Sequence, residues 1–212
     1  MKIAIIGFGD LGIYIRDTLQ DFHEIKEPDF AFFDDKFAAS GHPNAFPFSE
    51  YKNERFSDHN FHLGLGYRHL KLKNQIIAEL VGMGRKLPVF IHPSAYVHPS
   101  VKIGSGSFIY PGCSIDRSTV IGTGVWIANA SVIPHDCLID DGCWFGANVV
   151  LSGKVRVGKN SFIGSGTTVS NDITISDNVI VGLGSVITKN IAEGLSVIGN
   201  PMRILENKIN LV

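Results

Sequence analysis

His135 stands beside an acidic residue in a segment that could do proton-transfer chemistry. The segment reads Val132-Ile-Pro-His-Asp-Cys137, so the carboxylate of Asp136 directly follows the imidazole of His135. An imidazole can take a proton from an attacking nucleophile, and an adjacent carboxylate can fix its tautomer and stabilise the cation that forms. A single histidine is more often structural than catalytic, so the elements that carry His135 must decide between these interpretations.

A second segment with chemical potential lies near the start of the chain. The turn Gly7-x-Gly9-x-x-Gly12 follows an apolar run, and such a turn presents backbone N–H groups and a helix N-terminus to a phosphate. Asp34 and Asp35 close the next apolar run, where an acid would meet a ribose hydroxyl. A domain this short supplies only half of a dinucleotide fold, so a mononucleotide or a nucleotide sugar fits better than NAD. A merely tight strand–helix turn is the alternative.

The elements that must position His135 follow from a strict repeat. A large apolar residue recurs at every sixth position from Ile91 to Ile187, and a small or β-branched residue follows each by four positions. An α-helix cannot carry this period, because its turn of about 3.6 residues would spread the apolar positions around every face. Hexapeptide repeats are typical of a parallel β-helix with three short strands per coil. Residues 91–191 would then form about five to six coils.

The cysteines all fall at the small inward positions of this repeat. Cys113, Cys137 and Cys143 are therefore predicted to fill the core, with no nucleophilic or metal-binding role. Their odd number, together with an N-terminus that reads as a first strand and not as an export signal, indicates a reducing compartment. We therefore expect a cytoplasmic protein.

The register also predicts which residues face outward. His135 stands two positions after a large inward residue, at a corner of the coil, so its side chain is not expected in the core. Arg117 and Gly153 lie one coil away on either side and should stack on it at about the spacing of adjacent strands, roughly 4.8 Å. A glycine at this place would leave backbone N–H groups open to a ligand carbonyl.

A column of aromatic residues is expected on one outer face. Phe108, Trp126, Trp144 and Phe162 are one coil apart and each directly precedes a large inward residue. An exposed aromatic strip of this length needs a cover. We favour a subunit interface over a ligand platform, and a groove between subunits would serve both. A three-sided prism closes naturally into a ring of three, so we expect a homotrimer.

The repeat marks one of two predicted domains. Residues 1–85 read as alternating strands and helices, typical of a small α/β unit of Rossmann-like character, and residues 90–206 form the predicted β-helix. The segment 37–60 receives no element. With 19 basic and 20 acidic residues the chain has no basic excess for binding nucleic acid. No apolar stretch is long enough to predict a membrane span.

These motifs together resemble one known family. A Gly-rich turn, then Phe32-Phe-Asp-Asp35, then Leu63-Gly-Leu-Gly66, then uninterrupted hexapeptides with the His135–Asp136 step, is similar to the sugar acyltransferases of the sialic-acid O-acetyltransferase and UDP-4-amino-sugar N-acetyltransferase type. Ser196–Arg203 resembles the closing segment that borders coenzyme A in hexapeptide acyltransferases. The resemblance implies a left-handed β-helix and transfer of an acyl group, with acetyl-CoA as co-substrate and no metal, to a nucleotide-linked amino sugar in surface-glycan biosynthesis.

The resemblance also implies roles for individual residues. His135 would be the general base, and Asp136 would orient it. The residues implied for the thioester and coenzyme A are Trp144, Gly153, Gly182, Leu183, Gly184, Asn200, Pro201 and Arg203. The residues implied for the nucleotide sugar are Gly7, Gly9, Asp34, Asp35, Lys36 and Gly66. Each active site would be shared between adjoining subunits of a homotrimer.

Two positions depart from the family pattern. Many members carry a second histidine nine residues after the first, and Trp144 stands there in this chain. An altered acyl pocket follows, so the acyl group need not be acetyl. The usual Gly-Asn-Asn after the third strand reads Gly66-Tyr67-Arg68, which leaves the nucleotide open.

Three other functions are compatible with parts of the sequence. A sugar O-acetyltransferase of the sialic-acid type would use the same base but would make less use of a nucleotide-type domain. An NAD-dependent oxidoreductase would use the Gly-rich turn but leaves the β-helix unexplained. A non-catalytic β-helix scaffold leaves the His135–Asp136 pair and the closing segment unexplained.

Overall fold

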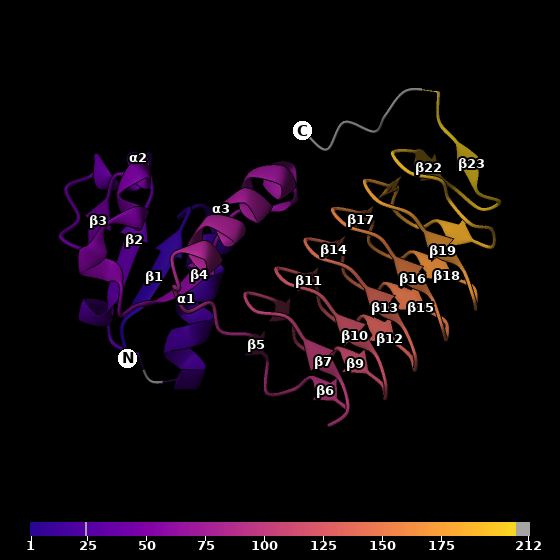
Figure 1. Cartoon of the computed structure of the whole chain (residues 1–212), viewed down its shortest axis with the longest axis horizontal. Coiled ribbons are helices and arrows are strands. Elements are labelled where there is room, and N and C mark those ends of the chain that lie inside the picture. The colour runs from indigo at the N-terminus through magenta and orange to yellow at the C-terminus, as the bar shows by residue number, and fades with distance from the viewer. Residues whose placement is uncertain (24, 207–212) are drawn as a thin grey trace. The chain divides into compact units, whose positions relative to one another are not determined.

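The structure is a computed structural model that describes residues 1–23 and 25–206. The chain divides into two compact units, Met1–Pro88 and Val89–Val212. Figure 1 labels the elements of both. No helix among the described residues has the length and apolar composition needed to cross a bilayer.

The first unit is built on a small parallel sheet. Its strands are β1 (Ile3–Ile6), β2 (Phe30–Phe33), β3 (Ala45–Phe46) and β4 (Asn60–Leu63), in the order β3-β2-β1-β4. Every pairing between them is parallel. All residues of β1 and β2 are buried, as expected for parallel strands covered on both faces.

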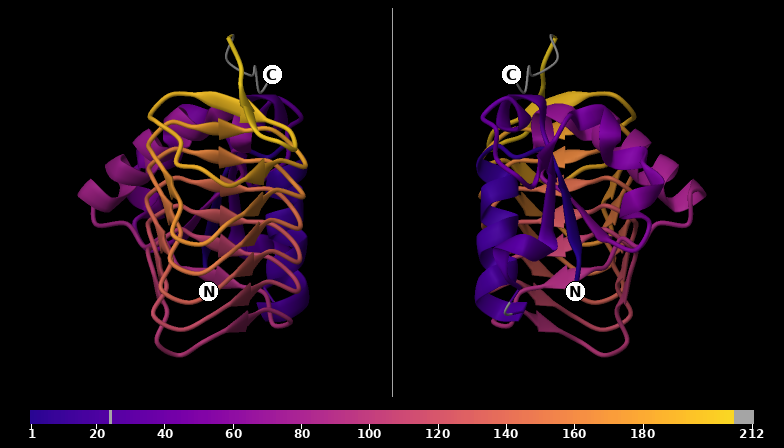
Figure 2. Two further views of the ribbon diagram at one scale, coloured as in Figure 1. Left: turned by 90° about the vertical axis from the view of Figure 1, so that its right-hand side faces the viewer. Right: turned by 90° about the vertical axis from the view of Figure 1, so that its left-hand side faces the viewer.

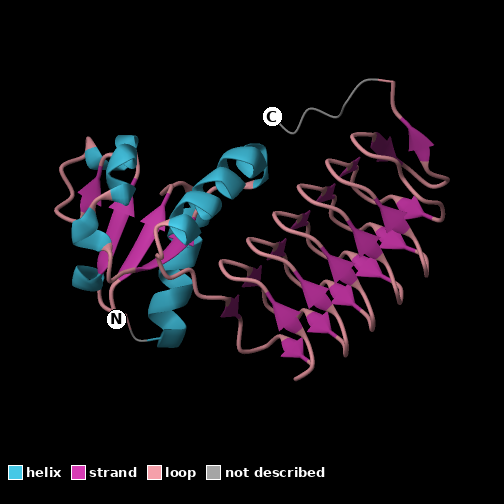
Figure 3. Cartoon of the chain, viewed as in Figure 1, coloured by secondary structure: helices cyan, strands magenta, loops and turns pink. Residues whose placement is uncertain are grey.

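Helices complete this unit, as Figure 3 shows in cyan. The α-helices are α1 (Asp10–His23), α2 (Asp35–Ala38) and α3 (Leu70–Gly82). The 3-10 helices are η1 (Glu27–Asp29), η2 (Phe48–Lys52), η3 (Glu54–Phe56) and η4 (Tyr67–His69). The small parallel sheet and its helices agree in part with the Rossmann-like domain predicted from the sequence.

The segment 37–60, which received no element from the sequence, forms one edge of this sheet. It supplies β3 and the turns η2 and η3. Its aromatic residues pack against the sheet, with the ring of Phe56 4.8 Å from that of Phe33 and 5.0 Å from that of Phe46. The phenylalanines of this segment thus form the core at this edge of the sheet, where the strand itself has only two residues.

The second unit is a parallel β-solenoid of about six turns, which matches the left-handed β-helix predicted from the hexapeptide repeat. Figure 2 shows its coils stacked as rungs. Each coil contributes one two-residue strand to each of three sheets, and strands of successive coils pair in register, as Trp126 with Phe108 and Trp144. The three sheets are the three faces of a prism.

We name these faces by the residues that point outward from them. The aromatic face consists of β5 (Phe90–Ile91), β8 (Phe108–Ile109), β11 (Trp126–Ile127), β14 (Trp144–Phe145), β17 (Phe162–Ile163), β20 (Ile180–Val181), β22 (Ser196–Ile198) and the antiparallel β23 (Arg203–Ile204). The uncharged face consists of β6 (Tyr96–Val97), β9 (Ser114–Ile115), β12 (Val132–Ile133), β15 (Val150–Leu151), β18 (Thr168–Val169) and β21 (Val186–Ile187). The mixed face consists of β7 (Lys102–Ile103), β10 (Val120–Ile121), β13 (Leu138–Ile139), β16 (Arg156–Val157) and β19 (Thr174–Ile175).

The inward positions of the repeat form the core of the solenoid. The large inward residues from Ile109 to Ile187 are buried. Cys113, Cys137 and Cys143 are buried free thiols in this core, as predicted. Burial raises the pKa of Cys143 to about 12 and raises the pKa of the other two thiols as well, so none of them forms a thiolate readily.

The predicted aromatic column is present, but its expected exposure is wrong. The rings of Trp126 and Trp144 are 5.0 Å apart and nearly parallel, and Phe108 continues the stack at 4.9 Å from Trp126. The four predicted members are buried within the single chain, at 3–9% exposure. A direction away from the coil axis does not by itself mean contact with solvent.

Candidate active site

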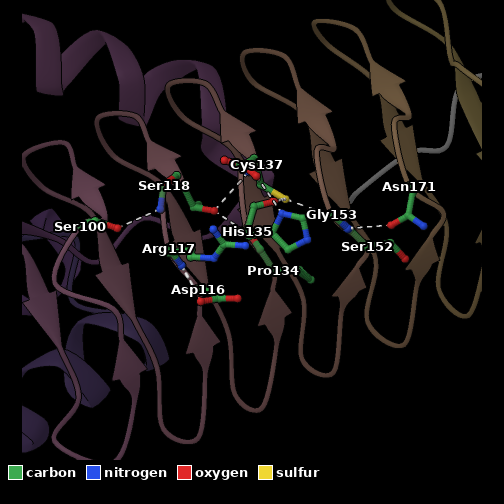
Figure 4. A network of polar contacts seen from close by, with 12 residues as sticks. Ser100, Asp116, Arg117, Ser118, Pro134, His135, Cys137, Ser152, Gly153 and Asn171 are labelled. Carbon is green, nitrogen blue, oxygen red and sulfur yellow. Dashed lines mark hydrogen bonds and ion pairs between the residues drawn. The ribbon is translucent and has the colours of Figure 1, made fainter.

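His135 lies at the corner where the chain passes from β12 on the uncharged face to β13 on the mixed face. Its side chain is 39% exposed, so it belongs neither to the core nor to the fully solvated surface. Figure 4 shows the imidazole between Arg117 and Gly153. The backbone links the same corner of successive coils, since the N–H of Asp136 donates to the carbonyl of Arg117 and that of Lys154 donates to the carbonyl of His135.

A buried hydroxyl holds the turn that carries His135. Thr119, at a small inward position of the preceding coil, donates its Oγ1–H to the carbonyl oxygen of Pro134 at 2.7 Å. Oγ1 of Thr119 in turn accepts the N–H of Cys137 at 3.2 Å. Both ends of the turn are thereby tied to the core, which fixes the corner from which the imidazole projects.

Asp136 orients the imidazole. Nδ1 of His135 lies 2.8 Å from Oδ2 of Asp136. A carboxylate can only accept, so in the neutral imidazole Nδ1 carries the proton and Nε2 carries the lone pair. The hydrogen bond from His135 holds the pKa of Asp136 below its usual value, and the positive charges of Arg117 and Lys154 act in the same direction. Nε2 has no hydrogen-bond partner among the described residues, so the arrangement presents an available base.

The backbone of Asp136 is left-handed, with φ of 60°. Aspartate tolerates this conformation better than most residues because its short polar side chain can bond locally. The same residue therefore serves the turn and the imidazole.

Gly153 lies against the imidazole, as the coil spacing predicts. A Cβ at this position would be 2.8 Å from Cε1 and 2.9 Å from Nε2 of His135. The N–H of Gly153, however, donates to Oδ1 of Asn171 at 2.9 Å. The expectation of an open N–H group at Gly153 is wrong for this structure, because the next coil supplies an acceptor. Asn171 occupies the same corner position as His135, two coils further on, and that spacing could have identified it.

Other residues implied for the thioester lie elsewhere on the prism. Gly182, Leu183 and Gly184 follow β20, at the corner between the aromatic and uncharged faces. Leu183 is exposed, and Gly182 is backed by Ile198 of β22. Asn200 and Pro201 lie in the exposed connection between β22 and β23, and the exposed Arg203 begins β23.

Trp144 is also remote from His135 within one chain. It lies on the aromatic face, which is the one face that does not meet at the His135 corner. It is 9% exposed. A single chain therefore does not bring Trp144, or the corner at Gly182–Gly184, to the imidazole, and the roles of these residues stay predictions.

The residues implied for the nucleotide sugar lie at the carboxyl ends of β1, β2 and β4. Strand β1 lies between β2 and β4, so this edge includes the point at which the strand order reverses, where parallel sheets bind ligands. Gly7 has φ of 83°. A side chain at Gly12 or Gly64 would collide with the carbonyl oxygen of Gly7, which makes the turn tight.

Gly9 and Gly66 differ from these packed glycines. A Cβ at either position would meet nothing within 4 Å. The backbone at these two glycines is thus open at the sheet edge, and the exposed Lys36 is the basic residue among those implied for the nucleotide.

The two aspartates of this edge already serve the fold. Asp34 accepts the N–H of Phe37 at 2.9 Å as the N-cap of α2, and its other oxygen accepts the N–H of Phe8 at 3.1 Å. Asp35 accepts the N–H of Phe48 at 2.8 Å. The bond from Phe8 ties the Gly-rich turn to the end of β2, and the other two tie that end to α2 and η2. A structural role is therefore sufficient to explain both carboxylates, and their contact with a ribose stays a prediction.

The described residues contain no group of three or more His, Cys, Asp or Glu side chains that could hold a metal ion. The chemistry of the His135 corner rests on the imidazole, the carboxylate and the backbone around them.

Comparison with known proteins identifies structures similar to the whole chain. The acetyltransferase domain of PglB from Neisseria gonorrhoeae, solved in complex with acetyl coenzyme A, is 30% identical over 96% of this chain and 98% of that chain, with a TM-score of 0.86. PerB from Caulobacter crescentus, solved in complex with CoA and GDP-perosamine, is 28% identical over 97% of each chain, also with a TM-score of 0.86.

Two further comparisons are less specific. WeeI from Acinetobacter baumannii, at 22% identity over 97% of this chain and 100% of that chain with a TM-score of 0.86, shares the fold. The family model described as the GMPPB C-terminal domain matches residues 87–181, within the repeat region. No curated protein sequence matches the chain significantly.

Proposed function

The chain belongs to the hexapeptide-repeat, left-handed β-helix family of sugar N-acetyltransferases, and from this premise we propose that it acetylates the amino group of a nucleotide-linked sugar with His135 as the general base. It is an acetyltransferase that uses a coenzyme A thioester. The observation that carries the proposal is the available Nε2 of an imidazole whose Nδ1 is held by Asp136.

In the proposed reaction the amine nitrogen of the sugar attacks the thioester carbon. Nε2 of His135 takes the proton that the nitrogen loses as the C–N bond forms. The C–S bond then breaks, and the same proton passes from the imidazolium to the leaving thiolate. Asp136 keeps the imidazole in the productive tautomer and stabilises its cation. A base placed in this way contributes roughly 10² to 10⁴ in rate, and the positioning of both substrates contributes more.

Direct transfer is favoured over a covalent acyl-enzyme. The chain has three thiols, and all of them are buried and have raised pKa values: Cys113, Cys137 and Cys143. A nucleophilic cysteine needs an accessible thiolate. The proposed route therefore passes directly from thioester to amide. We propose a cytoplasmic location, which fits the odd number of cysteines and the absence of a disulfide between them.

The first unit is proposed to hold the nucleotide of the acceptor. The open backbone at Gly9 and Gly66, at the reversal point of a parallel sheet, supports this role, as does Lys36. GDP-perosamine, bound by PerB, is a nucleotide-linked sugar of this class. We assign the phosphate contacts to backbone N–H groups of the Gly-rich turn. Asp34 and Asp35, proposed for the ribose, already accept backbone N–H groups within the fold.

A homotrimer is proposed to complete each site. The corner at Gly182–Gly184 and the corner at His135 lie at different edges of one prism, so a second subunit is needed to join them. The uncharged face supports self-association, since its outward residues include the exposed Tyr96, Val132 and Val150 and no charged residue. In a cyclic trimer this face would contact the mixed face of the next subunit, because a ring is closed by two different surfaces.

The trimer proposal is tested by Val150→Glu, which places a charge at the centre of the uncharged face. The expected result is a shift from trimer to monomer in sedimentation velocity, with loss of turnover. Ala39→Glu, at an exposed position in the first unit, is the control and should remain trimeric. A trimeric Val150→Glu variant would rule out this face as the interface.

The acyltransferase proposal is tested by thiol release from acetyl-CoA across a panel of UDP-, dTDP- and GDP-linked amino sugars and free sialic acid. Turnover on one nucleotide-linked amino sugar is expected. Turnover on sialic acid alone would replace N-acetylation with O-acetylation. Silence across the panel, with acetyl-CoA still bound, would exclude these acceptors and direct attention to the acyl pocket around Trp144.

A further inference from the structure

The backbone N–H and carbonyl groups of Gly153 both form hydrogen bonds within the chain. Its N–H donates to Oδ1 of Asn171 at 2.9 Å, and its carbonyl oxygen accepts the N–H of Asp172 at 3.2 Å. Figure 4 shows the bond from Gly153 to Asn171 beside the imidazole of His135. An N–H group has one proton, so any other acceptor at Gly153 must displace the carboxamide.

This N–H is next to the base. The place of a Cβ on Gly153 is only 2.9 Å from Nε2 of His135. A nucleophile that loses its proton to Nε2 attacks a carbonyl within the same few ångströms. Negative charge then develops on the carbonyl oxygen and needs a donor that is already in position. Gly153 lies beside the imidazole of His135, on the next coil. Its N–H group is hydrogen-bonded to the amide oxygen of Asn171.

Two bonds at the same repeat position elsewhere in the solenoid differ from that of Asn171 in the charge of the acceptor. Oδ1 of Asp141 accepts the N–H of Thr123, and Oδ1 of Asp177 accepts the N–H of Lys159, both at 2.8 Å and both between adjacent coils. At those corners the acceptor is a carboxylate. At the His135 corner the acceptor is a neutral amide, which binds an N–H more weakly and places no negative charge where an oxyanion would form.

We propose that Asn171 is a positioning residue whose carboxamide oxygen stands in for the acyl oxygen at Gly153 and is displaced when the thioester binds. This inference rests on the proposed acyltransferase function. The side chain of Asn171 is exposed, so it can rotate away without disturbing the core. Its bond keeps the N–H aligned before the thioester arrives and competes with the acyl oxygen for it.

The test compares the dissociation constants of acetyl-CoA and of CoA, measured by isothermal titration calorimetry without acceptor. CoA lacks the acyl carbonyl, so it does not compete with Asn171. In Asn171→Ala the competitor is gone, and acetyl-CoA should bind roughly 2- to 10-fold more tightly while CoA binds as before. In Asn171→Asp a charged acceptor holds the N–H more firmly, so acetyl-CoA should bind several-fold more weakly, again with CoA unchanged.

Asn190→Ala is the matched control. Oδ1 of Asn190 accepts the N–H of Thr174 at 2.8 Å, the same kind of bond at a site without a base. This variant should leave the ratio of the two dissociation constants unchanged. Asn171→Asp retains an acceptor at the corner, so it keeps the experiment decisive even if Asn171→Ala is poorly folded.

Two outcomes separate the inference from the function on which it rests. If wild-type protein binds both CoA and acetyl-CoA, and the ratio does not move in opposite directions in the two Asn171 variants, the role of Asn171 is refuted while the acyltransferase proposal stands. If wild-type protein binds neither ligand, the acyltransferase proposal itself fails.

Discussion

The imidazole of His135 fills the space that a side chain at Gly153 would need. A Cβ there would lie 2.8 Å from Cε1 and 2.9 Å from Nε2. Gly153 does not have the left-handed φ found at many other corner residues, so close approach and not backbone conformation requires a glycine. The position of the His135 imidazole therefore requires a glycine at residue 153, one coil away.

Gly153→Ala is expected to reduce kcat without unfolding the protein. The added methyl group must push the imidazole out of position, and a displacement on the order of 1 Å can cost about 10²-fold in rate. The measurement is steady-state thiol release together with a thermal melt. Gly82→Ala, at the end of α3 where a Cβ meets nothing within 4 Å, should leave turnover unchanged. Full activity of Gly153→Ala would show that the imidazole position is not critical.

His135→Ala should lower kcat by roughly 10² to 10⁴, because the proton of the nucleophile then has no base. The side chain is partly exposed and lies outside the core, so the melting temperature and the oligomeric state should not change. His98→Ala is the control, since His98 lies at the equivalent corner of an earlier coil and its Nδ1 contacts Ser100 and no acidic residue among those described. Wild-type turnover in His135→Ala would remove the general base from the proposal.

Two substitutions at Asp136 separate its two roles. Asp136→Asn keeps a residue that accepts the left-handed backbone but removes the charge, so kcat should fall by about tenfold or more with little change in stability. Asp136→Ala should lose activity and also about 1 kcal/mol of stability, because alanine fits φ of 60° poorly. Paired kinetic and urea-unfolding measurements test this. Equal stability of the two variants would contradict the backbone role.

Ala130 offers a test of corner strain away from the base. Its φ is 56°, whereas Gly112, Gly166 and Gly184 occupy the same corner in other coils. Ala130→Gly should raise the free energy of unfolding by about 0.5 kcal/mol. The relief of backbone strain at a left-handed φ should exceed the greater conformational entropy that a glycine loses on folding. Ala128→Gly, two residues earlier and without a positive φ, should instead lower it. Chemical denaturation of both variants decides the point, and a destabilised Ala130→Gly would refute the strain argument.

Acid should weaken the first unit through Glu79. Hydrogen bonds from Tyr51, Lys52 and Gln75 hold the pKa of Glu79 at about 2, below its ordinary value of 4.5. A depressed pKa in the folded state contributes stability that is present above pH 4.5 and is lost as the pH falls towards 2. The melting temperature of wild type should therefore exceed that of Glu79→Gln at neutral pH, and the gap should narrow below pH 4.5. A constant gap would contradict this linkage.

Much of the second unit could be predicted from the sequence because its order is local. A period of six residues decides which side chains face inward, and successive coils stack in register, as Trp126 pairs with Phe108 and Trp144. The inward cysteines, the corner position of His135 and its contact with Gly153 all follow from that period. The resemblance to sugar acyltransferases added the chemistry, because the His135–Asp136 step lies in its expected place.

The tertiary structure decided how the polar and aromatic groups are used. Asp34 and Asp35, predicted to contact a ribose, also accept backbone N–H groups within the fold, and the side chain of Trp126 is buried. Asn171, on the next coil, accepts a hydrogen bond from the N–H of Gly153. Each of these outcomes depends on which group meets a donor or a neighbouring surface in space. A repeat in the sequence sets the direction of a side chain, but only packing sets the partner that it finds.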